Sequence, residues 1–387
     1  MTSNIQLLDK KGYANLKAVM DPNIDLYLIL GMRGDGKTFS AVSLALDAMF
    51  PTRQGVTAKP SAYVRRLDAS LTKAECNRLL QPHVKGAGRS HPSIEKRSKG
   101  QYNNYTYRAG EFKPVYTDWE TGSTERTGEP MLYTMALNTW ETSKGADRGD
   151  LAYIIFDEFI TSKSYFKDEV FAWENVISTL QRGRDVKIIM LANALNTFCP
   201  YFDYYGIDWE KYKPGDVADF KYKTGLKARF VHLPAKDPNS TKPQRKNRFF
   251  GLQNNSMSIT SGEWEIRTYR LLSQTNYEKS LRLYRCGIIF HGKRFICEVL
   301  MYAGESTDIF AYFYPAKNFR DCLVIFSDDD KMEPGSIYET CFGDGILSRD
   351  LLDLFTQGKM YYNTNKTGNY IQAWIENFVN KRRVIKP

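Results

Sequence analysis

Patterns that bind zinc or form disulfides are missing from this sequence. It has four histidines and six cysteines among 387 residues, and no C-x-x-C pair. The histidines form no cluster, so the spacing indicates neither a structural zinc site nor a disulfide framework. We expect reduced, partly buried thiols at Cys76, Cys199, Cys286, Cys297, Cys322 and Cys341.

Long apolar segments are missing as well. No uncharged apolar run reaches the roughly 18 residues that a membrane-spanning helix needs, and the N-terminus has no signal-peptide core. We therefore expect an intracellular protein with no membrane partner. Internal repeats and low-complexity tracts are also absent, which excludes solenoid and compositionally biased classes.

Acidic residues are outnumbered. The chain has 44 Asp and Glu against 54 Lys and Arg, and a formal net charge of +10, which suits a polyanionic partner. Residues 221–285 alone hold 14 Lys and Arg against 4 Asp and Glu, and they include the basic and aromatic run Lys242–Phe250. Such a surface typically binds a nucleic-acid backbone without reading bases, although a solvated charged face is the alternative.

A phosphate-binding pattern follows an apolar run near the N-terminus. Leu26–Leu30 predicts a buried strand, Gly31–Thr38 matches G-x-x-x-x-G-K-[ST], and Ser40–Met49 predicts a helix. Backbone N–H groups at such a helix N-terminus converge on phosphate, and glycines let the main chain approach closely. We expect Lys37 to reach the β- and γ-phosphates and the Thr38 hydroxyl to hold Mg²⁺. The residues of the loop assigned to nucleotide binding are Gly31, Arg33, Gly34, Asp35, Gly36, Lys37 and Thr38.

Two carboxylates end another predicted strand. Leu151–Phe156 is too short for a buried helix and rich in β-formers, and Asp157 and Glu158 follow it. Asp157 can join the Mg²⁺ shell opposite Thr38, while Glu158, on the other side of the pleat, can orient and deprotonate a water. This pair favours hydrolysis that drives motion over transfer of phosphate to a small molecule. The alternative is an acidic turn without chemistry.

A third predicted strand, Val186–Leu191, is followed by Asn193. Ligands lie beyond the carboxyl ends of parallel strands, so Asn193 is either a sensor of the γ-phosphate or a turn residue. A predicted helix, Glu174–Gln181, precedes this strand and ends before the segment Arg182–Asp185. An arginine there either offsets the helix dipole or acts as an arginine finger in a neighbouring subunit. No N-K-x-D motif is present, which favours ATP over GTP.

The motifs occur in a characteristic order. Gly31–Thr38 with its internal Arg33 is followed by Ala62–Arg66, by Ile155–Ile160, and by Leu191–Ala194 with Pro200–Phe202 after it. In this combination the chain resembles the DNA-packaging (encapsidation) ATPases of phi29-like short-tailed phages, over about residues 20–205. The resemblance implies a homo-oligomeric ring, pentameric in that family, that docks on the portal vertex of an empty procapsid and drives double-stranded DNA inward with ATP. A structural RNA that mediates docking is compatible with it.

The resemblance also assigns roles to single residues. The family's phosphate lysine, magnesium ligand, metal carboxylate and catalytic glutamate fall on Lys37, Thr38, Asp157 and Glu158. Its trans-acting arginine falls on Arg182, with Arg184 as a rival because the alignment needs a one-residue gap. Lys144 matches a second basic residue that acts across the subunit boundary. Lys163 and Lys167 fall in the segment that touches DNA phosphates, although this segment has a threonine where a basic residue is expected.

The chain is long enough for two or three domains. We expect an α/β P-loop ATPase domain of the ASCE type with a central parallel sheet, then a linker domain, then a C-terminal domain, over residues 1–237, 238–275 and 276–387. Leu281–Phe290 and Arg294–Leu300 predict a hairpin, with further strands at Ile309–Tyr314 and Cys322–Phe326. A final helix is predicted to bury one face formed by Tyr370, Ile371, Trp374, Ile375 and Phe378.

The large terminases of other tailed phages carry a ribonuclease-H-like nuclease after the ATPase domain. In that nuclease, strand-borne carboxylates hold two metals. Here the first strand of the C-terminal domain has no carboxylate, and Asp328–Asp330 is more simply a solvated turn. We therefore expect a vestigial, ribonuclease-H-like α/β domain without nuclease activity.

These observations favour an ATP-driven translocase that packages viral DNA, with ATP and Mg²⁺ as cofactors. We expect it in the host cytoplasm, transiently at the procapsid portal vertex, and not in the mature virion. One alternative is a DNA helicase or DNA-pumping translocase. The other is a non-enzymatic portal-docking or DNA-binding factor with a vestigial nucleotide site.

Overall fold

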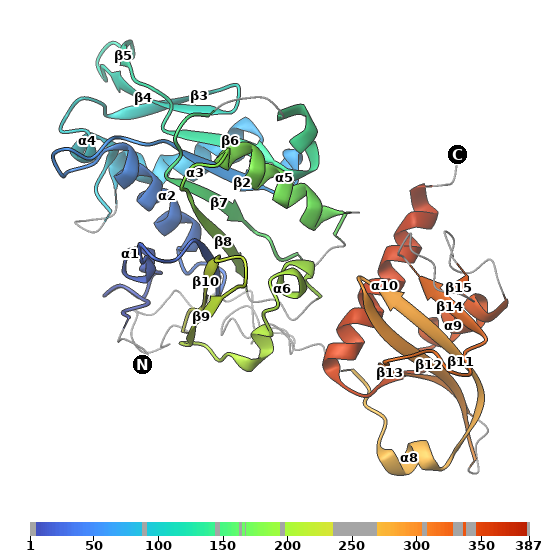
Figure 1. Cartoon of the computed structure of the whole chain (residues 1–387). Helices are drawn as coiled ribbons and strands as arrows, with labels where there is room; N and C mark the ends of the chain where they lie inside the picture. Colours follow the sequence, from blue (N-terminus) through green and yellow to red (C-terminus); the bar gives the residue numbers. More distant parts are fainter. Residues whose placement is uncertain are drawn as a thin grey trace, which may run out of the picture. The chain divides into compact units, whose positions relative to one another are not determined.

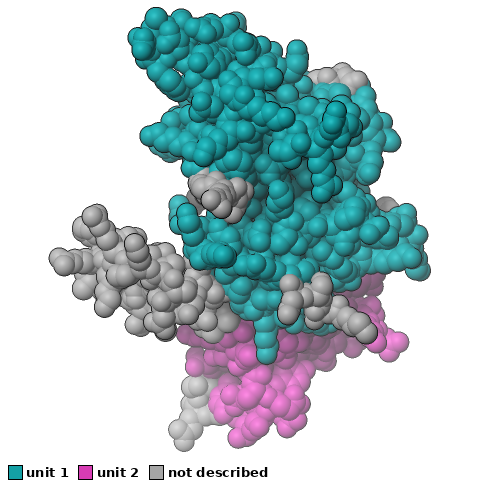
Figure 2. Space-filling view, turned by 90° about the vertical axis from the view of Figure 1, so that its left-hand side faces the viewer, with its two compact units in different colours: residues 1–161, 165–195, 201–264 teal, residues 162–164, 196–200, 265–387 magenta. Residues whose placement is uncertain are grey.

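The computed structural model describes residues 5–86, 91–143, 148–161, 165–166, 168–193, 198–234, 269–303, 308–327, 336–337 and 346–384. The chain forms two compact units, which Figure 2 distinguishes by colour. Unit 1 comprises residues 1–161, 165–195 and 201–264, and unit 2 comprises residues 162–164, 196–200 and 265–387. No helix in the described ranges has both the length and the apolar character to cross a bilayer.

Unit 1 is built on a ten-stranded sheet of order β3-β4-β6-β2-β7-β8-β1-β10-β9, with β5 paired to β4 (Figure 1). The strands are β1 (Leu26–Gly31), β2 (Ser61–Arg65), β3 (Asn104–Arg108), β4 (Glu111–Thr117), β5 (Thr124–Thr127), β6 (Leu132–Ala136), β7 (Tyr153–Asp157), β8 (Lys187–Asn193), β9 (Val217–Lys221) and β10 (Lys227–His232). Six neighbouring strands of this sheet run parallel to one another, namely β6, β2, β7, β8, β1 and β10. Parallel strands buried on both faces read as continuous apolar runs, which is why β1, β7 and β8 could be predicted.

One extra strand, β8, lies between β1 and β7. The strand before the phosphate loop is therefore not a direct neighbour of the strand that ends in the acidic pair. This insertion defines the ASCE type, so the predicted fold class is confirmed. The carboxyl ends of β1, β2, β7 and β8 meet at one edge of the sheet, which is where ligands bind in open α/β folds.

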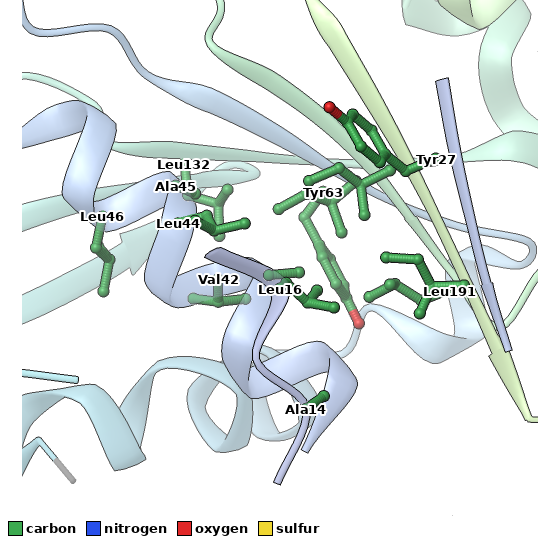
Figure 3. Packing of buried hydrophobic residues seen from close by; sticks show 14 of the residues in the cluster. Ala14, Leu16, Tyr27, Val42, Leu44, Ala45, Leu46, Tyr63, Leu132 and Leu191 are labelled. Carbon is green, nitrogen blue, oxygen red and sulfur yellow. The ribbon is translucent and has the colours of Figure 1, made fainter. Parts of the chain in front are cut away.

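Helices cover the sheet of unit 1. They are α1 (Leu16–Val19), α2 (Lys37–Met49), α3 (Lys73–Lys85), α4 (Ile94–Arg97), the 3₁₀ segment η2 (Leu137–Ser143), α5 (Glu169–Gln181) and α6 (Pro200–Tyr204). Buried side chains of α2 such as Val42 and Ala45 belong to one apolar cluster with Tyr63 (Figure 3). Helix α5 begins at Glu169, five residues before the predicted start, and the Glu169 carboxylate accepts from the Phe166 N–H of the preceding segment.

Unit 2 holds a six-stranded sheet of order β15-β14-β11-β12-β13-β16. Its elements are α8 (Gln274–Glu278), β11 (Ser280–Phe290), β12 (Lys293–Tyr302), β13 (Ile309–Pro315), β14 (Val324–Ser327), β15 (Ser336–Ile337), α9 (Ile346–Thr356), β16 (Met360–Tyr362) and α10 (Asn365–Val384). Strands β11 to β13 form an antiparallel meander, and β14 and β15 add to β11 in parallel. This is the strand order of the ribonuclease-H-like fold, as predicted.

The core of unit 2 includes the predicted face of α10. Tyr370, Ile371, Trp374 and Ile375 are all at most 7 % exposed. The side chain of Phe378, residues 238–268 of the linker domain predicted over 238–275, and Asp328–Asp330 lie outside the described residues. The five described cysteines are free, and four of them are buried.

Candidate nucleotide-binding site

The phosphate loop joins β1 to α2 through two residues with left-handed backbone. Gly34 has φ +86° and Gly36 has φ +76°, a region that side chains other than glycine rarely adopt. Gly31 is restricted by space, since a Cβ there would lie 2.8 Å from Asp35 Oδ2 and 2.9 Å from Leu233 Cδ1. The glycines predicted from the pattern are therefore needed by the local geometry.

Asp35 braces this loop from within. Its side chain is 1 % exposed, and Oδ2 accepts from the Met32 N–H at 2.5 Å. The backbone oxygen of Asp35 accepts from the Ala14 N–H at 2.7 Å, and the Leu16 N–H donates to Ser40 Oγ at 3.2 Å. The N-terminal segment thus fastens both the loop and the first turn of α2, which the sequence analysis did not foresee. Arg33, in the same loop, is exposed.

Lys37 and Asn193 meet at the carboxyl edge of the sheet. Lys37 Nζ donates to Met32 O at 2.7 Å and to Asn193 Oδ1 at 3.1 Å, across 156 residues of chain. Lys37 is only 7 % exposed, although it begins a helix. An ammonium held beside the loop carbonyls and an amide is placed as a phosphate-binding point charge, with the amide in reach of the same phosphate.

Thr38 and Asp157 also meet. Thr38 Oγ1 donates to Asp157 Oδ2 at 2.8 Å, and Asp157 is 4 % exposed. Two oxygens at this separation fit neighbouring corners of a Mg²⁺ octahedron, whose ligands stand about 3 Å apart when each bond is about 2.1 Å. Within the described ranges no group of three or more His, Cys, Asp or Glu side chains could share a metal ion. The oxygen pair therefore fits the few-ligand mode in which Mg²⁺ relies on substrate phosphates.

Strand β2 supplies two site residues that lie in the motif Ala62–Arg66 but to which the sequence analysis gave no role. Tyr63 OH donates to Asp157 Oδ2 at 2.7 Å, and Arg65 Nη1 lies 3.5 Å from the same oxygen. Burial, reinforced by the Asp157 charge, raises the pKa of Tyr63 well above its usual range, so the phenol stays a donor. Burial alone would lower the pKa of Arg65, but its oxygen neighbours on Tyr63, Asp157 and Glu158 outweigh burial and raise it.

Glu158 has an unusual backbone and a single strong ion pair. Its φ is +58°, and its carboxylate Oε2 accepts from Arg65 Nη2 at 2.6 Å while the side chain remains 57 % exposed. A non-glycine residue in this region costs about 1–3 kcal/mol and persists where the surroundings hold it, typically at active sites. The surroundings here are Phe159, which is fully buried and whose N–H donates to Leu191 O at 3.3 Å.

The arginines after α5 precede the start of β8, at the amino ends of the parallel strands. Helix α5 leads from the end of β7 back to the start of the parallel strand β8. Its 13 residues span about 20 Å. Arg182, which ends the helix with φ +45°, donates from Nε to Thr179 O at 3.3 Å. Arg184 donates to Gly149 O at 2.7 Å and lies 3.8 Å from Asp150. Neither arginine is near the phosphate loop of its own chain.

The remaining predicted residues are not described. Lys144, Lys163 and Lys167 all lie outside the described residues. Their assignments stay predictions.

Comparison with known proteins agrees with this geometry. Residues 128–219, which include β7, α5 and β8, match the family of the podovirus DNA encapsidation protein (Gp16). The DNA packaging proteins of Bacillus phages phi29 and PZA are each 24 % identical over 205 residues, covering 52 % of this chain and 52 % of theirs. The chain thus spans about half the length of the curated relatives it matches.

Two solved structures share the fold. One is the phi-28 gp11 DNA packaging motor, with a TM-score of 0.58, 18 % identity, and coverage of 96 % of this chain and 98 % of that one. The other is the bacteriophage phi-29 viral genome packaging motor assembly, with a TM-score of 0.57, 18 % identity, and coverage of 96 % and 99 %. The likeness extends through both units. The chain is therefore a homologue of the DNA packaging proteins of Bacillus phages phi29 and PZA.

Proposed function

We propose that this protein is an ATP-driven translocase that packages viral double-stranded DNA into an empty procapsid through the portal vertex. The observation that carries the proposal is the meeting, at one edge of the sheet, of a phosphate lysine, a hydroxyl–carboxylate pair and a second carboxylate. This set is what phosphoryl transfer from a nucleoside triphosphate to water needs. The relatives that the chain matches are named DNA packaging proteins.

Each group has a separate task. Lys37 binds the phosphate oxygens as a point charge, and the side-chain amide of Asn193 contacts the same phosphate. Thr38 and Asp157 would hold Mg²⁺, which when bound would neutralise charge on the phosphates. Glu158 orients the attacking water and takes its proton.

Arg65 restrains this base. While Glu158 Oε2 is engaged by Arg65 at 2.6 Å, that oxygen is not available to a water. The other oxygen, Oε1, can still accept a hydrogen bond from a water, so Arg65 can orient the carboxylate while it acts. Because the carboxylate is more than half exposed, the pair is worth about 1 kcal/mol or less, which a bound nucleotide can offset.

A neighbouring subunit completes the site. Arg182 follows α5, whose 13 residues run for about 20 Å from the β7 end of the sheet to the start of β8, so we assign its action to the site of another chain. Lys144 is proposed to act across the same boundary. This arrangement requires a homo-oligomeric ring, for which we propose five subunits.

Further partners follow from charge and resemblance. Lys163 and Lys167, between β7 and α5, are proposed to contact DNA phosphates, and the basic segment 221–285 adds positive charge. Docking on the portal places the protein in the host cytoplasm during assembly, with a structural RNA as a further partner.

The C-terminal unit is proposed to lack nuclease activity. Strand β11 has no carboxylate, and only residues 316–323 connect β13 to β14, without a helix. The ring of Phe319 instead packs on Gly287, 2.6 Å from where a Cβ would lie. The domain boundaries 1–237, 238–275 and 276–387 remain part of the proposal.

The first test is ATP hydrolysis by the full chain with and without long double-stranded DNA. We expect stimulation by DNA in the parent, no hydrolysis by Glu158→Gln, and parental rates for Glu120→Gln, an exposed control. Mixing inactive Glu158→Gln with inactive Arg182→Ala subunits should restore activity, and Arg184→Ala should stay active. Normal hydrolysis by Glu158→Gln together with no DNA effect would instead favour the docking factor.

A further inference from the structure

A buried carboxylate lies behind the hydrolytic edge. Glu169, the first residue of α5, has a side chain that is only 1 % exposed. Four donors surround it: Arg66 Nε and Arg66 Nη2 at 2.6 Å each, Tyr201 OH at 2.9 Å and the Phe166 N–H at 3.1 Å. These donors match the acceptor capacity of a carboxylate, so this contact set is complete.

The donors come from three different segments. Arg66 directly follows β2, Phe166 lies between β7 and α5, and Tyr201 lies in α6, which follows β8. These are the strands that end in Arg65, in the acidic pair of β7 and in Asn193. One carboxylate therefore ties together the three segments that leave the sheet beside the nucleotide groups.

Two further contacts lead from this carboxylate to the catalytic glutamate. The Arg66 guanidinium lies over the ring of Tyr165, 4.8 Å from its centroid. Tyr165 OH donates to Phe159 O at 3.3 Å, and Phe159 directly follows Glu158. Tyr165 thus links Arg66 to the residue that follows the left-handed Glu158.

Arg65 and Arg66, at the end of β2, point to opposite faces of the sheet and contact different acidic residues. Neighbouring residues at a strand end point to opposite sides. Arg65 contacts Glu158 itself, and Arg66 contacts the anchor of the segment that Glu158 begins. A shift of β2 moves both contacts together.

We propose that Glu169 and Arg66 are positioning residues of the hydrolytic site, whose ion pair holds the ends of β2, β7 and β8 in the arrangement in which Glu158 acts. The proposal rests on the proposed ATP hydrolysis. Removing one partner of a buried ion pair destabilises a protein whatever the pair does, so a loss of stability alone would not identify the role of this pair. Here the pair also sets the position of a reacting group.

The test uses the full chain and compares Glu169→Gln, Arg66→Met and Arg66→Lys with the parent. We expect kcat to fall about tenfold to a hundredfold in the first two variants, as for a misplaced catalytic group, while the dissociation constant for ATP changes less than about threefold. Arg66→Lys keeps the charge and should recover part of kcat.

The matched control is Arg229→Met. Arg229 is also buried and forked on a carboxylate, with bonds of 2.7 and 2.8 Å to Asp219, but it lies on β10 away from the donors of Glu169. It should lose thermal stability and keep kcat. Unchanged kcat in folded Glu169→Gln, or an equal loss of kcat in Arg229→Met, would overturn the proposal.

Hydrogen exchange tests the positioning role of Glu169 separately from the proposed ATP hydrolysis. Without nucleotide, the backbone amides of residues 158–161, 165–166 and 168–169 should exchange at least about tenfold faster in Glu169→Gln than in the parent. This measurement does not depend on hydrolysis. If the parent fails to hydrolyse ATP, the proposed function fails whatever the exchange result. If exchange is unchanged in Glu169→Gln, the positioning role fails even in an active enzyme.

Discussion

His83 makes the stability of unit 1 sensitive to acid. It lies in the last turn of α3 and is fully buried, with its ring stacked on Phe39 at a centroid distance of 4.3 Å and an interplanar angle of 8°. Neither ring nitrogen has a hydrogen-bond partner among the described residues. Burial first, then the charges of Arg97 and His91, lower the pKa of His83 to about 3. The neutral ring is therefore the only form that the folded site accepts.

The sign and size of the effect follow from this pKa. Between pH 6.5 and 3 the unfolded chain binds a proton at His83 that the folded protein excludes. The contribution of neutral His83 to the free energy of unfolding is therefore complete above pH 6.5 and is lost as pH falls toward 3. Relative to pH 8, the loss is about 2 kcal/mol at pH 5 and about 5 kcal/mol once pH is below the folded pKa.

The assay is urea unfolding of the parent and of His83→Phe at pH 8 and at pH 5. Phenylalanine keeps the stacked ring, removes the titration and leaves no unsatisfied ring nitrogen, so the variant should be at least as stable at pH 8. The parent should lose about 2 kcal/mol more than the variant between the two pH values. His291→Asn, at an exposed histidine, serves as the control with parental behaviour. Equal losses in the parent and in His83→Phe would refute the reasoning.

Three further outcomes are expected. Thr38→Val should raise the Mg²⁺ concentration for half-maximal hydrolysis at least about tenfold, because Asp157 loses the hydroxyl beside it, whereas Thr38→Ser should not. Gly287→Ala should destabilise unit 2 by about 1–3 kcal/mol in calorimetry, because the new methyl meets the Phe319 ring, and a parental transition would contradict this. Glu298→Leu should cost about 3–5 kcal/mol in the same experiment, since removing this fully buried carboxylate takes the ion-pair partner from both Arg282 and Arg285.

The sequence patterns that succeeded were local ones. The phosphate loop is specified by glycines whose backbone only glycine readily adopts, and the parallel strands are specified by unbroken apolar runs. The hairpin of β11 and β12 was predictable because a short glycine turn joins two apolar strands. In each case the determinant lies within about ten residues of chain.

The residues that were missed depend on which strands are neighbours. Tyr63 and Arg65 reach Asp157 only because β2 pairs with β7, although about 90 residues separate them. Glu169 looked like an ordinary acidic residue ahead of a helix, and its four donors come from segments far apart in the chain. No local pattern encodes such pairings, because they follow from strand order and the packing of the whole sheet.

The sequence by itself determined which chemistry is predicted: a candidate phosphate loop, a candidate oxygen pair for Mg²⁺ and a candidate base, each given by residue types at fixed spacing. The tertiary structure alone decided how that chemistry is restrained. It placed Arg65 on Glu158, bent the backbone of that glutamate into the left-handed region, and buried Glu169 behind it. The physical reason is that a side chain's type is a property of one position, whereas its charge partners and burial are properties of positions that only folding brings together.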